Sequence, residues 1–297
     1  MKCNNIQLPI SSKKYDDNKL YERALKTNTI KAIEIMSDIT IPSSVFKYRS
    51  FGNYEDEGQQ NWKENSHWKD SMNGELFFST PKDFNSNDPN DCKLYLDSNA
   101  IKRYDEKKFT EWRNGLLANK RIGCFTTQSC THPEMWDNPY FGSNGEGYCI
   151  EYRVTEKDFY PNNIIFLKVV YANAPYDSTP LLKLLDKFEI DEVATKKLIC
   201  LGYTPFLIKN EKYSSECEWR IIIPNNRYES YFDDPNKGIK NMKDLIKAIY
   251  LGPNYKNIPN WKEKKEYVLN IARNSQIKVY EVLKEADILQ YKLKELV

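Results

Sequence analysis

The chain has 297 residues, of which 40% are hydrophobic, and this length can bury a sizeable core in one large domain or two tightly joined ones. Its 44 Lys and Arg residues nearly balance its 42 Asp and Glu residues, so the net charge of +2 leaves no basic surplus that would indicate a nucleic-acid partner. No apolar run approaches the roughly 18 residues that span a bilayer, and the N-terminus lacks a hydrophobic signal core, so we expect a cytoplasmic protein without a membrane partner.

The seven cysteines form no C-x-x-C pair, and only two histidines are present. Scattered, odd-numbered cysteines favour free thiols in a reducing compartment. The scarcity of histidine argues against a two-His metal site, and the spacing of Cys124, Cys130 and His132 matches no standard zinc site. We therefore expect no metal site built from these residues.

The N-terminal part is expected to be separate from the main domain. Residues 1–14 are polar and predict a loose arm, and the apolar residues spaced through 16–37 predict a helix. We therefore assign residues 1–44 to an N-terminal arm and helix, and residues 45–297 to a single α+β domain. That domain opens with a short apolar strand over 45–50.

After this first strand, the charged segment 55–70 predicts helix or loop. A second strand is expected over 74–80, where Pro81 ends it. The dense turn-formers of 84–91 then predict a tightly structured loop, because Asn and Asp side chains hydrogen-bond to nearby backbone groups. A polar helix over 101–120 follows.

The middle of the chain predicts strands joined by aromatic and Gly-rich loops. A strand over 121–127 ends in hydroxyl residues and leads into an aromatic stretch at 134–141. The Gly-rich turn 142–147 lacks the GxxxxGK[ST] phosphate loop, and no strand–GxGxxG–helix unit appears. Residues 148–154 predict a strand that pairs with 121–127 across this turn, and 164–171 predicts another.

The last third of the chain alternates helices and strands. The predicted helices cover 181–201, 242–247 and 260–274, and a charged helix closes the chain. The predicted strands cover 216–224, after a polar turn that opens at Lys209, and then 248–251 and 277–283. Strands in succession with irregularly interspersed helices argue against regular βαβ winding. We therefore predict an α+β fold whose core is a mixed, largely antiparallel sheet with flanking helices.

One strand of this last third carries the most distinctive polar pattern. Because successive side chains of a strand alternate between its faces, Glu216, Glu218 and Arg220 are expected on one face. Cys217 and Trp219 are then expected on the other face. Two neighbouring carboxylates are costly unless a cation, a hydroxyl or a substrate compensates them. The pattern therefore indicates either a structural ion pair or a functional cluster.

A series of short motifs gives the chain a family resemblance over roughly residues 45–283. In order they are Tyr48-Arg49-Ser50, Phe78-Ser79-Thr80-Pro81, Phe84-Asn85 with Asn87-Asp88-Pro89 and Asp91, Cys124-Phe125-Thr126, Met135-Trp136, Gly147-Tyr148-Cys149-Ile150, Val170-Tyr171, and Lys209 with Glu216-Cys217-Glu218-Trp219-Arg220. The series resembles the bacterial family of domains of unknown function numbered 2971. Some members of that family are associated with abortive-infection phage defence, so the resemblance implies an antiviral effector.

A second resemblance is to ADP-ribosyltransferases. These enzymes carry, in order, an Arg or His at the end of one strand, a strand with a hydroxyl-rich end, and an E-x-E strand. Arg49, Phe125-Thr126-Thr127 and Glu216-Cys217-Glu218 stand in that order here. The resemblance implies NAD as a substrate, an ADP-ribosyltransferase-like fold, and transfer to an unidentified macromolecular acceptor.

The same resemblance implies roles for individual residues. Glu218, oriented by Thr126, would hold the ribose 2′-OH and stabilise the oxocarbenium ion that develops as the nicotinamide–ribose bond breaks. Glu216 would position or deprotonate the acceptor. Arg49 would grip the pyrophosphate through its planar fork. The other implied NAD-binding residues are Tyr48, Phe125, Trp136 and Arg220, with Phe125 or Trp136 stacking on the nicotinamide or adenine.

Two other functions stay open at this point. The first is a metal-dependent nuclease or phosphohydrolase, in which Arg220 contacts phosphate and Mg²⁺ is shared by Asp88, Asp91, Glu216 and Glu218. A chelator would stop that enzyme, whereas the transferase would consume NAD without a metal. The second is a sensor or binding module whose Arg and Glu residues form a buried structural network. In such a module Glu218→Gln lowers stability, whereas for a catalytic Glu218 the melting temperature is expected to hold or rise.

Overall fold

The computed structural model describes residues 41–52, 67–84, 88, 91–93, 95, 106–118, 120–154, 165–173, 177, 179, 203–284 and 291–297. The predicted arm at 1–14 and the predicted helices at 16–37 and 181–201 lie outside these residues. Most of segment 55–70 and of loop 84–91 also lies outside them.

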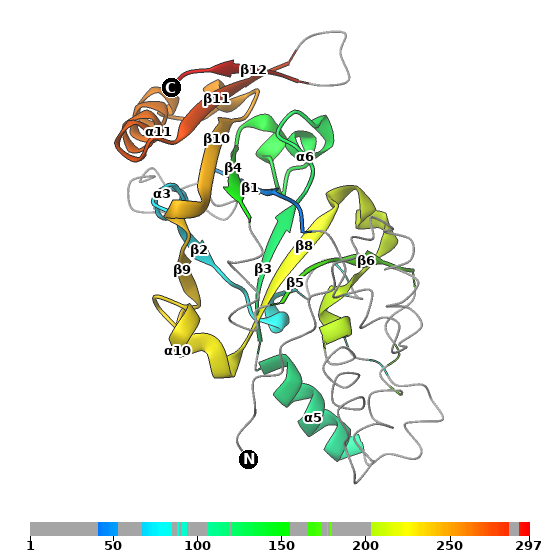
Figure 1. Ribbon diagram of the computed structural model, residues 1–297. Coiled ribbons are helices and arrows are strands. Elements are labelled where there is room, and N and C mark those ends of the chain that lie inside the picture. Colours follow the sequence, from blue (N-terminus) through cyan, green and yellow to red (C-terminus); the bar gives the residue numbers. More distant parts are fainter. Residues whose placement is uncertain are drawn as a thin grey trace.

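The centre of the structure is an eight-stranded mixed sheet with the strand order β12-β11-β10-β4-β1-β3-β8-β5 (Figure 1). Its strands are β1 (Ser44–Arg49), β3 (Lys120–Thr126), β4 (Tyr148–Arg153), β5 (Ile165–Lys168), β8 (Glu218–Pro224), β10 (Ile246–Leu251), β11 (Lys278–Leu283) and β12 (Lys292–Glu295). Neighbouring strands are antiparallel except β10 and β11, which run parallel and are joined through helix α11 (Trp261–Ser275). The predicted α+β class with a largely antiparallel sheet is therefore confirmed.

Smaller elements surround this sheet. Two further sheets pair β2 (Glu75–Phe77) with β9 (Ile239–Asn241), and β6 (Val170–Tyr171) with β7 (Ile208–Lys209). The other α-helices are α3 (His67–Met72), α5 (Glu106–Ala118), α6 (Pro133–Asp137) and α10 (Tyr228–Tyr231). The 3-10 turns are η2 (Pro81–Phe84), η3 (Ser143–Gly145), η5 (Thr204–Leu207), η6 (Glu211–Glu216), η7 (Asn225–Arg227), η8 (Lys243–Leu245) and η9 (Tyr255–Asn257).

Both faces of the sheet are covered by apolar side chains. The larger core lies on the face that carries Val45, Ile150 and Ile249, and the buried stripe of α11 packs into it. The smaller core lies on the opposite face around Phe46 and Tyr48. Because alternate residues of β1 enter different cores, this strand needs apolar side chains on both of its faces, as its sequence predicts.

The partner predicted for the strand at 148–154 is wrong. Strand β4 pairs with β1 on one side and with β10 on the other, and β1 lies between β4 and β3. The connection from β3 to β4 contains α6 and η3 rather than a tight hairpin turn. It is therefore long enough for β4 to lie on the side of β1 that is away from β3. The two-faced apolar pattern of β1 suits the central position that it takes.

Two other predicted elements differ from the structure. The strand predicted from Glu216, after a polar turn, begins instead at Glu218, because η6 extends through Glu216 and Cys217 caps it in the left-handed conformation. The charged helix predicted to close the chain is absent from residues 291–297, where β12 pairs with β11 instead. The open edge of β11 offers backbone hydrogen bonds that outweigh the weak helix propensity of this short charged segment.

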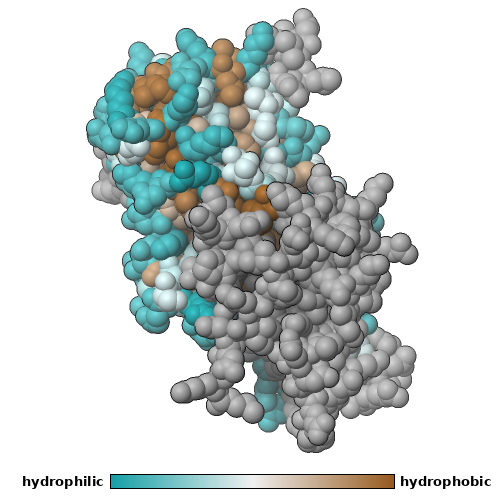
Figure 2. Space-filling model, in the orientation of Figure 1, coloured by the Kyte–Doolittle hydropathy of each residue, from teal (hydrophilic) through white to brown (hydrophobic). Residues whose placement is uncertain are grey.

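Hydrophilic residues cover most of the described surface on the face shown in Figure 2. No helix in the described part of the chain has the length and apolar content that crossing a membrane requires. Among the described residues, Tyr140 is the most exposed of the large apolar side chains, with 76% of its surface accessible, and it lies beside the cavity that the next section describes.

Candidate functional site

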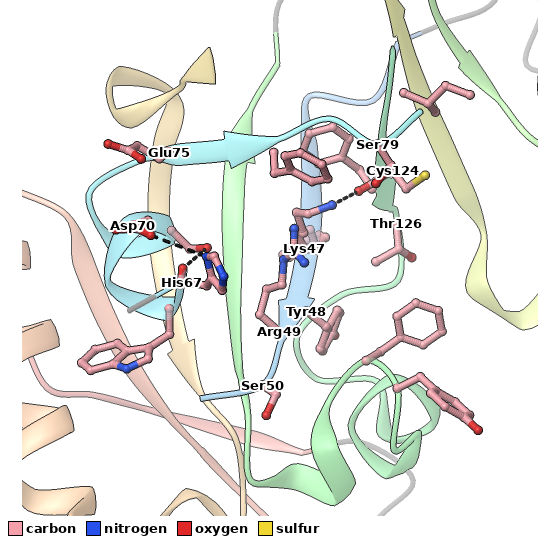
Figure 3. Close-up of a pocket in the computed structure, with 18 of the residues that line it drawn as sticks. Lys47, Tyr48, Arg49, Ser50, His67, Asp70, Glu75, Ser79, Cys124 and Thr126 are labelled. Atoms are coloured by element: carbon pink, nitrogen blue, oxygen red, sulfur yellow. Dashed lines mark hydrogen bonds and ion pairs between the residues drawn. The ribbon is translucent and has the colours of Figure 1, made fainter. Parts of the chain in front are cut away.

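The candidate site is a cavity of about 1040 Å³ that opens where strands β1 and β3 diverge. These two strands pair at Phe46 and Thr126, whereas β1 pairs with β4, and β3 with β8, along nearly their whole length. Beyond Phe46 the gap in the sheet is bridged by Lys47, whose Nζ donates a hydrogen bond to the carbonyl oxygen of Cys124 at 2.7 Å (Figure 3). The cavity is thus lined by residues from both faces of the sheet.

Most of the residues singled out in the sequence line this cavity. The lining includes Tyr48, Arg49, Phe125, Thr126, Glu216 and Glu218. These six residues come from β1, β3 and the η6–β8 segment, so the structure brings three distant parts of the chain together. Arg220 and Trp136 do not line it, because both are completely buried beneath its walls.

Glu216 and Glu218 form a carboxylate wall of the cavity, and backbone and hydroxyl contacts fix the position of this wall. Cys217, between the two glutamates, adopts the left-handed backbone conformation with φ 44°. The hydroxyl of Thr126 donates a hydrogen bond to the backbone oxygen of Glu216 at 2.5 Å, and the backbone N–H of Glu218 donates to the hydroxyl of Tyr171 at 2.8 Å. Thr126 therefore positions the backbone of this segment and not, as predicted, the Glu218 carboxylate.

Lys209 joins the two carboxylates. Its Nζ lies 2.5 Å from Oε2 of Glu216 and 3.1 Å from Oε2 of Glu218, and all three side chains are almost completely buried. This amine supplies the compensating cation that two neighbouring carboxylates require. A basic residue that precedes the E-x-E segment was visible in the sequence as part of the family motif, but its role was not predicted.

Arg220 lies under the carboxylate wall and fixes Glu218. Its Nε donates to Oε1 of Glu218 at 2.8 Å, while its Nη1 and Nη2 donate to the two carboxylate oxygens of Asp91 at 2.7 and 2.9 Å. A further bond of 2.8 Å goes to the backbone oxygen of Phe206. With no exposed surface and its donors engaged, Arg220 acts as a support for Glu218 and is not placed to touch a ligand.

The environment separates the pKa values of the two glutamates. Burial raises the pKa of Glu216 to about 7, with Lys209 opposing the rise and Glu218 adding to it. Burial also disfavours the ionised form of Glu218, but Arg220 and then Lys209 more than offset it and hold the pKa of this carboxyl well below its usual range. Near neutral pH the site thus offers one permanent anion and one carboxyl that can accept or release a proton.

A basic wall, formed by Lys47 and Arg49 of β1, lines the same cavity from the other face of the sheet, because Phe46 and not Lys47 is aligned with Thr126 and Glu218. Lys47 and Arg49 point to the same side of β1, as alternate residues of a strand do (Figure 3). The Nε of Arg49 is buried and has no hydrogen-bond partner among the described residues. Gly147 of the neighbouring loop passes so close that a Cβ there would lie 2.3 Å from the backbone oxygen of Arg49, so only glycine allows this approach.

The pKa of Lys47 is lowered to about 7, first by burial and then by the positive charge of Arg49. The unfolded chain keeps this lysine protonated up to about pH 10, so between these values it binds more protons than the folded protein. We therefore expect the free energy of unfolding of the wild type to rise by on the order of 1–3 kcal/mol over this range, relative to Lys47→Met. Urea unfolding of both proteins at several pH values measures this difference. If the free energies of unfolding of the two proteins changed with pH in parallel, the expectation would be wrong.

Aromatic side chains form the rest of the lining. Phe125 lies under the amine of Lys47, whose Nζ is 5.3 Å from the ring centroid. Tyr48 donates its hydroxyl proton to the backbone oxygen of Ser129 and packs edge-on against Trp136, with ring centroids 4.8 Å apart. Trp136 itself is buried and donates to the backbone oxygen of Cys130. Phe125 thus lines the cavity as a buried part of the main core, whereas Trp136 supports Tyr48 from behind.

Tyr140 is a cavity residue that the sequence did not single out. It belongs to the predicted aromatic stretch, and its backbone N–H donates to Oδ1 of Asn138 at 2.8 Å, which orders the loop at that point. Its ring is largely exposed although it lines the cavity. A planar group entering the cavity can stack on such a ring.

The acidic residues of the metal-enzyme alternative are engaged in other contacts. Asp91 is bound by Arg220, and Asp88 accepts a hydrogen bond from the backbone N–H of Asn210 at 2.8 Å. Within the described ranges, no group of three or more His, Cys, Asp or Glu side chains has an arrangement that could hold a metal ion. The arrangement of these carboxylates is therefore that of an ion-pair network.

Comparison with known proteins gives a family match and no function. A family model described as "Protein of unknown function (DUF2971)" matches residues 135–221, which run from α6 into β8 and include both glutamates of the carboxylate wall. No curated protein and no solved structure matches the chain.

Proposed function

We propose that the cavity binds NAD as a substrate and that the carboxylate wall catalyses transfer of its ADP-ribosyl group to a nucleophilic acceptor. The observation that carries this proposal is the pair Glu216 and Glu218, whose pKa values are driven apart in a cavity that Arg49 also lines, with its buried Nε lacking a hydrogen-bond partner among the described residues. A cavity of about 1040 Å³ lies at the upper end of the usual range for ligand sites and is large enough for a dinucleotide.

In the proposed reaction the bond between nicotinamide nitrogen and ribose C1′ breaks, and its electron pair leaves with neutral nicotinamide. The positive charge that develops on the ribose is stabilised by Glu218, which stays ionised because Arg220 and Lys209 hold it so. The acceptor attacks C1′, and its proton passes to Glu216. Arg49 binds the pyrophosphate from β1.

The strand order sets how far apart the basic and acidic walls lie. Phe46, Thr126 and Glu218 are aligned across β1, β3 and β8, so the backbones of the basic and acidic walls are separated by about 10 Å, or two strand spacings. Strand β3 lies between the two walls, so a ligand that contacts both would pass through the opening where β1 and β3 diverge. Tyr140 offers an exposed ring on which nicotinamide or adenine can stack.

Release of nicotinamide tests the proposal directly. The purified protein is incubated with NAD, alone and with a bacterial cell extract as a source of acceptor, and nicotinamide is followed by chromatography. We expect release that continues in the presence of a chelator. Absence of nicotinamide under both conditions would overturn the transferase, and a phosphodiester-cleaving activity that the chelator stops would favour the metal-dependent alternative.

The protonation of Glu216 predicts the pH profile of this reaction. A general base works only when ionised, and the pKa of Glu216 is raised to about 7, so the rate is expected to fall roughly tenfold for each pH unit below about 7. Glu216→Gln removes the base and is expected to give a low rate that does not fall further as the pH is lowered below about 7. An unchanged pH profile in Glu216→Gln would exclude Glu216 as the base.

The place of this activity in a cell is proposed from the family resemblance. We propose that the protein acts as an abortive-infection effector whose consumption of NAD or modification of an acceptor arrests an infected bacterium. Phage plaque counts on a host that expresses the wild type, compared with Glu218→Gln at the same protein level, test this role. Equal plaque counts for the two strains would count against it.

A further inference from the structure

The cations around the cavity differ in whether they already have partners. Lys209 is paired with both glutamates, Arg121 donates to three backbone carbonyls, and Lys237 lies 3.6 Å from the carboxylate of Asp234. Lys47 and Arg49 instead form no ion pair with any residue that the structure describes, and the amine of Lys47 is met by a carbonyl and an aromatic ring. Two cations on one strand face are thus left without a counter-ion.

This arrangement is electrostatically unfavourable in the absence of an anion. The groups that act on the Lys47 amine are Arg49 beside it on β1, Cys124 on β3 and Glu218 on β8, and the pKa of the amine falls despite the last two. Glu218 cannot serve as its partner, since Arg220 and Lys209 already bind this carboxylate. A cationic pair kept in a buried position without compensation is a feature of sites that bind anions.

We infer that Lys47 and Arg49 together bind the diphosphate group of the ligand, with Arg49 as a two-pronged donor and Lys47 as a point charge that also spans the gap between β1 and β3. The choice of a diphosphate rests on the proposed function, whereas the cation pair rests on the geometry alone. Guanidinium groups match two phosphate oxygens at once, and an ammonium group neutralises a third without a directional requirement.

Proton uptake accompanies this binding. The amine is close to half-protonated near neutral pH in the free protein, because its pKa is about 7. A bound phosphate favours the charged form and raises that pKa, so at a pH above 7 the ligand draws a proton from the buffer onto Lys47. A diphosphate bound only at exposed lysines would cause no such uptake, since those amines are already charged.

The test uses isothermal titration calorimetry of the full chain at pH ~8 in two buffers that differ in ionisation enthalpy, with ADP and inorganic pyrophosphate as the probes. For the wild type we expect binding of ADP with a net uptake of up to one proton. Lys47→Met is expected to weaken binding at least ~10-fold and to remove the uptake. The matched control is Lys294→Met, an exposed lysine on the edge strand β12, which should bind as the wild type does.

The outcomes separate this inference from the proposed reaction, because ADP contains no nicotinamide–ribose bond. Binding of ADP that depends on Lys47, without any nicotinamide release from NAD, would keep the cation pair and remove the transferase. Nicotinamide release with ADP affinity and proton uptake unchanged in Lys47→Met would remove the cation pair and keep the transferase. Failure of the wild type to bind either ADP or pyrophosphate would also overturn the inference. A melting curve of Lys47→Met like that of the wild type ensures that lost binding is not lost folding.

Discussion

Glu218→Gln is expected to reduce nicotinamide release from NAD by about 1000-fold, which corresponds to roughly 4 kcal/mol of transition-state stabilisation. The neutral amide keeps the size of the side chain but removes the fixed negative charge that the developing oxocarbenium ion needs. Few other single changes in the cavity remove a charge that is so well oriented, since Arg220 and Lys209 hold this carboxylate from two directions.

The same substitution is expected to lower stability, which reverses the expectation drawn from the sequence. Relief of repulsion between the two glutamates would stabilise the protein only if no cations lay between them. The low pKa of Glu218 means that its ionised form is favoured by folding, so its contribution is present at neutral pH and is lost only as the pH falls through that low pKa. A lower melting temperature therefore cannot by itself distinguish a catalytic Glu218 from a structural one.

Asp91→Asn provides the matched control. Asp91 binds the same guanidinium, is equally buried and loses the same charge when it becomes an amide, yet it does not line the cavity. Both variants should therefore melt earlier than the wild type, while only Glu218→Gln loses nicotinamide release when assayed well below its melting temperature. Equal losses of activity in the two variants would show that the network is needed only for folding.

The sequence predicts the elements of the site better than it predicts their arrangement. The alternation of E-x-E-x-R groups Glu218 with Arg220, which do bond, and the order of the motifs selects Arg49, Thr126 and Glu216, which line one cavity. It does not show on which side of the strand the cavity opens. The resemblance therefore assigns Arg220 to ligand binding, although its Nη1 and Nη2 donate hydrogen bonds to Asp91, which is distant in the sequence.

The position of the cavity depends on how β1 and β3 separate, and this has no local signature in the sequence. Each strand reads as an ordinary apolar strand, and the separation follows from their different partners, β4 and β8. Pairing the strand at 148–154 with the one at 121–127 would have closed this opening. The sequence does contain one indication of the cavity. Lys47 and Arg49 alternate with apolar residues in this strand, and a lysine is rarely buried unless it has a specific role.

Arg220→Met is expected to destabilise the protein by roughly 3–5 kcal/mol, because it removes the cation that binds the buried Asp91 and leaves Glu218 with Lys209 alone. The guanidinium has no exposed surface, so water cannot replace its hydrogen bonds to Asp91 and Glu218. Chemical denaturation of the wild type and the variant, monitored by tryptophan fluorescence, measures the difference. A loss below about 1 kcal/mol would mean that the network contributes little to folding.

A double substitution separates the loss of the ion pair from the loss of packing. When Arg220→Met is combined with Asp91→Asn, the uncompensated charge of Asp91 disappears, so the double variant should be more stable than Arg220→Met alone. Lys47→Met is the matched control for removal of a cation, since this buried amine has no carboxylate partner among the described residues and its loss should cost little. Simple additivity of the two changes at positions 220 and 91 would contradict a direct ion pair between them. The network would then owe its stability to the packing of the arginine stem, and Glu218 would rely on Lys209 to stay ionised.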